Sequence, residues 1–166
     1  MKLRLSLIAA IFALLISSCG KEFVPPTSVA ITSIKIKNFP ESNSSGNPWD
    51  GSLQGTLPDV YFKLADGSGV TIYSHPTNLR AENLRKADLP KTFTPTSSTN
   101  FYSFDYLDQG ISIGLYDYES IGTDEYMGGV KMGGTFRDLF ANDELPSSFD
   151  LTYGQYSFEV GVKWSY

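Results

Sequence analysis

Two runs of the chain alternate strictly between apolar and polar positions. In residues 110–116, Ile111, Ile113 and Leu115 occupy every second position. In residues 155–164 the apolar members at alternate positions are Tyr156, Phe158, Val160, Val162 and Trp164. Successive side chains of a β-strand point to opposite faces, so each run predicts a strand with one face in the core. The other face of the first run is then formed by Ser112, Gly114 and Tyr116.

Shorter runs of β-branched and aromatic residues predict further strands. The first covers residues 29–37, where Ile34 and Ile36 are expected in the core and Lys35 and Lys37 in solvent. The other runs are residues 58–64, 70–73, 91–94, 101–106, 126–132 and 151–153. We therefore expect about eight strands and an all-β fold.

Two stretches and one histidine depart from the strand pattern. Residues 77–89, ended by Pro90, have a loose helical spacing of apolar residues and are predicted to be helical. Residues 136–140 predict a single helical turn. His75 is the only histidine and has no cysteine near it, so we interpret it as a loop residue rather than a metal ligand or catalytic group.

Composition and charge narrow the class of protein. Of 166 residues, 41% are hydrophobic and 14% aromatic, and the formal net charge is −5. These values favour a folded domain and argue against disorder and nucleic-acid binding. Ten Tyr, eleven Phe, fifteen Gly and nine Pro are typical of short strands joined by turns. The single cysteine excludes an intrachain disulfide.

The amino-terminal segment has the pattern of a targeting signal. Lys2 and Arg4 precede an apolar run over residues 5–16 that is too short to span a membrane, and Cys19 follows two serines. Residues 1–18 resemble a bacterial lipoprotein signal peptide. This resemblance implies that Cys19 is lipidated and that the protein lies in the cell envelope, at the outer membrane or cell surface. The alternative is an ordinary secretory signal in which Cys19 is incidental.

The rest of the chain divides into a tether and one domain. Residues 19–28 contain Pro25 and Pro26 and are interpreted as a short tether that holds the domain off a membrane. Residues 29–166 are enough for one domain with a hydrophobic core. No internal repeat is visible in them.

Carboxylates are concentrated directly after residues 110–116. Asp117 and Glu119 end that run, and Asp124 and Glu125 follow in the same short loop. Crowded carboxylates repel one another unless a cation offsets the repulsion. Ca²⁺ is suited to this task because it takes roughly six to eight oxygen ligands from flexible loops. The spacing is not that of an EF-hand, so we expect a site carried by strands.

These residues resemble a motif of the C2 domains, a family of Ca²⁺- and phospholipid-binding β-sandwiches. The matching segments are Asp117-Tyr118-Glu119, Glu125-Tyr126-Met127-Gly128, and residues 58–64, in which Pro58 stands one place ahead of Asp59. The resemblance implies an all-β, C2-like, eight-stranded antiparallel Greek-key β-sandwich with Ca²⁺ as its cofactor. The implied metal ligands are Asp50, Asp59, Asp117, Glu119 and Glu125. For Asp50, a turn-capping role before Gly51 is the alternative.

The resemblance also implies a function in Ca²⁺-dependent binding. The carboxylates would form a negative cup for one or two Ca²⁺, and the cation would take phosphate oxygens of a phospholipid head group. Trp49 and Ile121 lie in loops whose apolar tips would enter the membrane, with ordinary loop packing as the alternative. Because a lipid on Cys19 already holds the protein at its own membrane, another surface, a partner protein or a glycan is also an open target.

Two other classes of function stay open from the sequence. One is a structural or adhesive surface lipoprotein with the same scaffold and no functional cation site. The other is an enzyme that hydrolyses a glycosidic bond with a carboxylate pair. The sequence has no Ser/His/Asp set, no zinc spacing, no phosphate loop and no cysteine nucleophile besides Cys19, so we expect no enzymatic activity.

Overall fold

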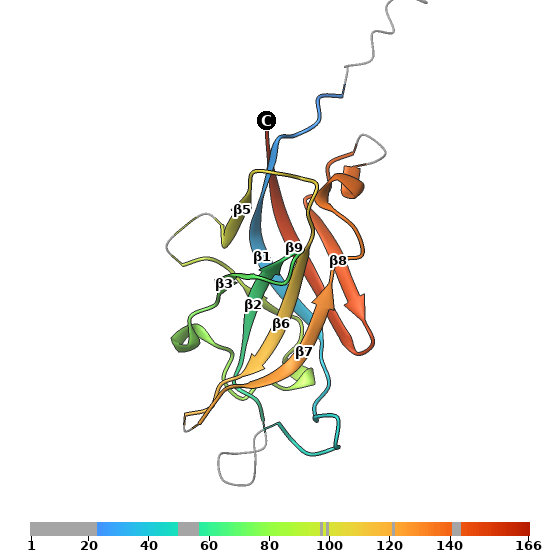
Figure 1. Ribbon diagram of the computed structural model, residues 1–166. Coiled ribbons are helices and arrows are strands. Elements are labelled where there is room, and N and C mark those ends of the chain that lie inside the picture. The colour runs from blue at the N-terminus through green and yellow to red at the C-terminus, as the bar shows by residue number, and fades with distance from the viewer. Residues whose placement is uncertain (1–22, 50–56, 97, 99, 121, 141–143) are drawn as a thin grey trace, which may run out of the picture.

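The computed structural model describes residues 23–49, 57–96, 98, 100–120, 122–140 and 144–166. Over these residues the chain forms two antiparallel β-sheets (Figure 1). The strands are β1 (Ser28–Asn38), β2 (Val60–Asp66), β3 (Thr71–Ser74), β4 (Lys91–Phe93), β5 (Tyr102–Phe104), β6 (Ile111–Asp117), β7 (Glu125–Lys131), β8 (Ser148–Tyr153) and β9 (Tyr156–Ser165). Three 3-10 helices accompany them: η1 (Thr77–Leu79), η2 (Lys86–Asp88) and η3 (Phe136–Phe140). The predicted signal segment, Cys19, Asp50 and Ile121 lie outside the described residues.

The first sheet is built around the long pair β1 and β9. Their register places Ile34 opposite Val160 and Ile31 opposite Val162, and β8 pairs with the outer edge of β9. On its other edge β1 pairs with β5 near its start and with β4 near its end. Both short strands lie in runs predicted from the sequence, residues 91–94 and 101–106. The described residues contain nine strands in all, where the sequence predicts about eight.

The second sheet has the strand order β3-β2-β6-β7. The β2 and β6 strands pair over their full length, from Val60 opposite Asp117 to Asp66 opposite Ile111. The chain passes from one sheet to the other after β1, β3, β5 and β7, which gives the Greek-key connections of a β-sandwich. The predicted fold class, an all-β antiparallel sandwich, is confirmed.

The apolar faces predicted from the sequence form the core between the two sheets. Ile111, Ile113 and Leu115 are buried, as are Ile34 and Ile36. Buried members from the strands of the first sheet also include Val29, Ile31, Phe93, Phe104, Phe158, Val160 and Val162. Among the described residues no helix is long and apolar enough to cross a membrane.

The continuous helix predicted over residues 77–89 is wrong. Only its two ends form turns, η1 and η2, because the middle of the segment pairs with the entry to β2. Ala81 exchanges backbone hydrogen bonds with Val60, at 2.8 Å in each direction, and the Leu84 N–H donates to the carbonyl of Pro58. These bonds replace the helical ones, and Ala81 and Leu84 are buried. The single turn predicted at residues 136–140 is confirmed as η3.

Two loop residues lie deeper than the sequence indicates. Trp49 is buried, and its indole N–H donates to the carbonyl of Pro40 at 2.7 Å, which agrees with ordinary loop packing, the alternative to an apolar tip that enters a membrane. His75 lies in the connection after β3 but is only 3% exposed. Its ring stacks on Phe62 with the ring centres 4.9 Å apart, and its edge faces Phe93. Burial among these rings lowers the pKa of His75.

Candidate functional site

The two acidic segments singled out in the sequence lie side by side at one end of the sandwich. Asp59 precedes β2 and Asp117 ends β6, and the register of these strands brings the two residues together. The backbone N–H of Asp59 donates to Oδ1 of Asp117 at 2.7 Å. The N–H of Tyr118 donates in return to the carbonyl of Asp59 at 3.0 Å. The resemblance therefore predicted this juxtaposition correctly.

The carboxylate of Asp59 is held by the segment between η1 and η2. Its Oδ2 accepts from Nε of Arg80 at 2.9 Å, and its Oδ1 accepts from the backbone N–H of Asn83 at 2.8 Å. The hydrogen bond to Asp59 is the main cause that raises the pKa of Arg80. Both side chains of the ion pair are partly buried. The cation that offsets the charge of Asp59 is thus supplied by the protein itself.

Further contacts fix the guanidinium of Arg80 in this place. One of its NH groups donates to the carbonyl of Thr77 at 3.0 Å. Another lies 3.2 Å from the carboxylate of Glu82. Its central carbon lies 4.5 Å from the ring centre of Tyr118, within the range of a cation–π contact. Arg80 therefore links the start of β2 to the segment that follows β6.

The other predicted ligands have different surroundings. Asp117 is fully buried at the end of β6, and Glu125 lies opposite it as the first residue of β7. Glu119 lies in the turn between these strands and is partly buried. Asp50 lies outside the described residues. The described members of the predicted ligand set are thus all buried or partly buried.

Asp124, which the sequence analysis did not include among the ligands, organises the turn between β6 and β7. Its Oδ2 accepts from the hydroxyl of Tyr61 at 2.7 Å, and its Oδ1 accepts from the N–H of Glu119 at 3.1 Å. Burial raises the pKa of Tyr61, and the bond to Asp124 raises it further. Aspartate in a short polar turn is a common hydrogen-bond acceptor for the backbone, and the position of Asp124 in such a turn was visible in the sequence.

A bound Ca²⁺ would need several carboxylate oxygens directed at one point. Within the described residues, no group of three or more His, Cys, Asp or Glu side chains is arranged to hold a metal ion. Both oxygens of Asp59 and one oxygen of Asp117 accept hydrogen bonds from protein N–H groups. The described part of this end therefore does not offer the oxygen cup that Ca²⁺ requires.

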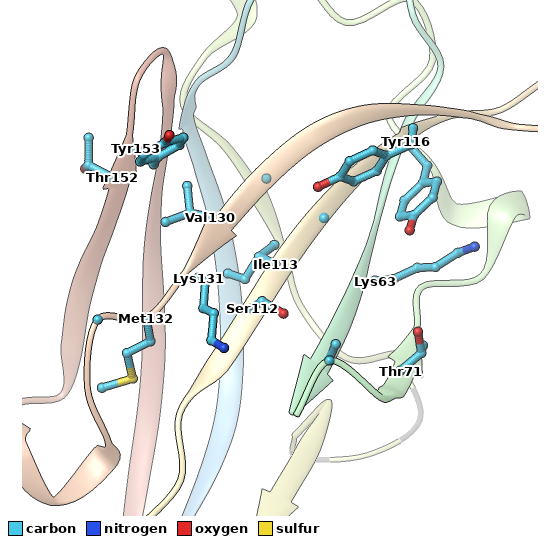
Figure 2. A pocket seen from close by; sticks show the side chains of 16 residues that line it. Lys63, Thr71, Ser112, Ile113, Tyr116, Val130, Lys131, Met132, Thr152 and Tyr153 are labelled. Atoms are coloured by element: carbon cyan, nitrogen blue, oxygen red, sulfur yellow. The ribbon is translucent and has the colours of Figure 1, made fainter. Parts of the chain in front are cut away.

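A second feature lies on the outer face of the sheet β3-β2-β6-β7 and is named here the outer groove. It has a volume of about 700 Å³ and is bounded on one side by the end of β8 (Figure 2). Its floor contains Gly114 and Gly129, which face each other across β6 and β7. A Cβ on Gly129 would collide with the carbonyl of Ile113, and one on Gly114 would lie 3.1 Å from the Tyr126 ring. Backbone atoms therefore form the floor of the groove at these two positions.

Tyrosines and lysines surround this floor. Tyr116 and Tyr126 lie in register on β6 and β7, with their ring centres 5.2 Å apart. Nζ of Lys63 lies 4.1 Å from the ring centre of Tyr116, and Nζ of Lys131 donates to the carbonyl of Gly67 at 3.1 Å. The hydroxyl-bearing side chains of the lining are Thr71, Ser112, Tyr116, Tyr126, Thr152 and Tyr153. The alternation in residues 110–116 predicts that Ser112, Gly114 and Tyr116 lie on this face, but it indicates no role for them.

Comparisons with known proteins give distant similarities only. No family model matches the chain, and no curated protein matches it. Among solved structures, a C2 domain of plant extended synaptotagmin 1 is similar, with a TM-score of 0.41 and 15% identity over 86% of this chain and 97% of that domain.

Two structures of human GIVD cytosolic phospholipase A2 are similar as well. The complex with methyl gamma-linolenyl fluorophosphonate gives a TM-score of 0.39 and 16% identity over 83% of this chain and 16% of the enzyme. The complex that also contains terbium chloride gives a TM-score of 0.37 and 16% identity over 83% of this chain. This chain thus spans a minor part of the phospholipase, 16% and 17% of its length in the two structures. The low scores mark a distant similarity in strand arrangement, which carries no residue role to this chain.

Proposed function

We propose that this protein is a lipid-anchored binding protein of the bacterial cell envelope, attached through Cys19, whose β-sandwich works without a bound cation. The observation that carries the cation-independent part is the ion pair between Arg80 and Asp59, 2.9 Å from Nε to Oδ2. A guanidinium that is fixed by several partners occupies the position where a cation would offset this carboxylate. The anchor rests on the lipoprotein-like segment that ends at Cys19.

The length of the tether in the sequence supports a binding role away from the anchoring membrane. Residues 20–27 separate Cys19 from β1, and a fully extended segment of this length reaches about 28 Å. Figure 1 shows that the start of β1 and the turn between β6 and β7 lie at opposite ends of the sandwich. The acidic end therefore lies at the opposite end of the sandwich from the start of β1, and the sheet faces lie between the two ends.

Ca²⁺-dependent binding is the second candidate. It is favoured by the direct hydrogen bond between the Asp59 and Asp117 segments. In this alternative Ca²⁺ takes the place of Arg80, and Asp50, Glu119 and Glu125 add further oxygen ligands. The two candidates differ in what Ca²⁺ does to stability, because a ligand that binds the folded state raises the unfolding temperature.

Thermal unfolding of residues 20–166 separates the two candidates. The measurement is made in chelator, then in millimolar Ca²⁺, with Mg²⁺ as the control for ionic strength. We expect the same midpoint in all three conditions. A rise that is specific to Ca²⁺ and absent from an Asp117→Asn variant would replace the proposal by the Ca²⁺-dependent one. The anchor is tested separately, by fatty-acid labelling of the full chain and of a Cys19→Ala variant.

A further inference from the structure

We propose that the outer groove binds an acidic polysaccharide, a chain of sugar rings that carry carboxylates. The chain carries 18 acidic and 13 basic residues. Among the described residues that line the groove, Lys63 and Lys131 are charged and no carboxylate is present. The groove is thus a basic surface on an acidic protein, which matches an anionic ligand.

The aromatic lining indicates which uncharged groups of the ligand lie between its charged groups. Tyr126 is 59% exposed and Tyr153 is 74% exposed, although both border the groove. Figure 2 shows Tyr153 and Tyr116 on opposite sides of it. A sugar ring presents flat C–H faces that pack on tyrosine rings, while its hydroxyls pair with polar side chains. Thr71, Ser112 and Thr152 supply such partners in the lining.

The spacing of the lysines favours an extended ligand over a small anion. Lys63 pairs with Gly114, whereas Lys131 pairs with Ser112, so the lysines are two strands and two positions apart. Ordinary strand spacing puts their Cα atoms on the order of 12 Å apart. Their ammonium groups also have different neighbours, the Tyr116 ring and the Gly67 carbonyl. A single phosphate or carboxylate does not span both, but a chain with repeated charges does.

Two other polyanionic partners fit this surface less well. DNA carries one charge per about 1.7 Å of its axis, and a protein with a net charge of −5 repels such a dense polyanion more strongly than a polymer with one carboxylate per sugar ring. A membrane surface is bound by apolar groups that enter the interface, together with attraction between basic groups and anionic lipids. The outer groove lies instead over the middle of a sheet, with Gly114 and Gly129 at its floor.

This inference rests on the proposed function in taking the domain to be a binding module, and the two are tested apart. Binding is measured in chelator, so a Ca²⁺ effect on stability and a failure of the groove to bind are separate results. Affinity electrophoresis and titration calorimetry are run on residues 20–166 with polygalacturonate and hyaluronate as acidic polysaccharides. Uncharged dextran and vesicles of phosphatidylcholine with phosphatidylglycerol are the comparison probes.

We expect binding to at least one acidic polysaccharide and weaker binding at higher salt. Tyr126→Ala and Tyr153→Ala should each weaken it roughly fivefold to tenfold. Lys63→Met and Lys131→Met should each weaken it about twofold to fivefold and reduce its salt dependence. The matched controls are Tyr106→Ala and Lys163→Met, which change exposed residues outside the groove and should bind as the unaltered chain does. The affected tyrosines are exposed, so unfolding midpoints should stay unchanged.

Three results would overturn the inference. One is the absence of binding to both acidic polysaccharides. Another is equal affinity for dextran, which would show that charge plays no part. The third is binding to the anionic vesicles, lost in Lys63→Met, without binding to either polysaccharide, which would assign the groove to a membrane surface.

Discussion

Arg80 and Asp59 form an ion pair at the end of the sandwich where the sequence predicted a metal ion, with Nε of Arg80 2.9 Å from Oδ2 of Asp59. The same carboxylate accepts from the backbone of Asn83, and the Asp59 N–H donates to Asp117. A single arginine thereby connects the segment after η1 with the ends of β2 and β6.

Removing this arginine should destabilise the protein and create a response to cations. Arg80→Gln leaves the partly buried Asp59 carboxylate without its cation and next to Asp117. We expect a loss of about 1–3 kcal/mol in the free energy of unfolding. We also expect millimolar Ca²⁺ to restore part of that loss, because a cation can then offset the repulsion between the two carboxylates.

Urea unfolding with and without Ca²⁺ measures both effects. Arg85→Gln is the matched control, since it removes an exposed arginine from the same segment. Equal stability of the two variants would show that the ion pair with Asp59 contributes nothing to the fold.

The C2 resemblance implies a Ca²⁺ ion beside Asp59, whereas the structure has Arg80 there. The physical reason for this difference is not visible in the sequence. The sequence shows the acidic residues that follow the apolar strand β6, and it shows Asp59 directly before the strand β2. The position of Arg80 is not visible in the sequence, because residues 77–89 do not form the predicted helix. Ala81 in this segment pairs with Val60 instead. That pairing turns Arg80 toward Asp59, and a helix over the same residues would have placed it elsewhere.

The strands were predictable because one face of each is in contact with the core. The alternating runs at residues 110–116 and 155–164 form the strands β6 and β9 in the structure. The outer groove depends instead on register, which places Gly114 beside Gly129 and Tyr116 beside Tyr126. Residues that far apart in sequence carry no local signal that they are neighbours, so the groove was not predicted.

His75 should make stability depend on pH below about pH 6.5. Its pKa is lowered from the ordinary 6.5 by burial among aromatic rings. Nε2 lies 3.2 Å from the carbonyl of Leu79, which can only accept, so Nε2 carries the proton of the neutral ring. The unfolded chain binds a proton at a higher pH than the folded one does. The stabilisation is therefore complete above about pH 6.5 and is lost as the pH falls below that value.

Urea unfolding at pH 7.5 and pH 5.5 tests this dependence, with His75→Gln as the variant that lacks the titrating group. The unaltered protein should lose stability between the two values, and the variant should lose less. Asp66, Asp108 and Asp138, whose pKa values are lowered by hydrogen bonds from neighbouring groups, titrate below this window. An equal loss in both proteins would assign the effect to other groups.

The hydroxyl of Tyr61 should stabilise the turn between β6 and β7. It donates to Asp124 at 2.7 Å from a buried position next to the Tyr116 ring. Tyr61→Phe keeps the ring and removes only this donor, so we expect a loss of about 0.5–1.5 kcal/mol in the free energy of unfolding. Tyr106→Phe, at a position 77% exposed, is the control and should be neutral. A neutral Tyr61→Phe would mean that water replaces the donor at no cost.

Gly129 should tolerate no side chain, because a Cβ there would collide with the carbonyl of Ile113 in the paired strand β6. Backbone cannot move aside as a flexible side chain can, so Gly129→Ala must push β7 away from β6. We expect a loss of about 1–3 kcal/mol in the free energy of unfolding, as for other overpacked positions. Gly133→Ala is the matched control, since a Cβ at that glycine meets nothing within 4 Å. Urea unfolding of the two variants should give a large difference between them. If Gly129→Ala were as stable as Gly133→Ala, β6 and β7 would separate at this point without loss of stability, and the floor of the outer groove would not be fixed by close backbone pairing.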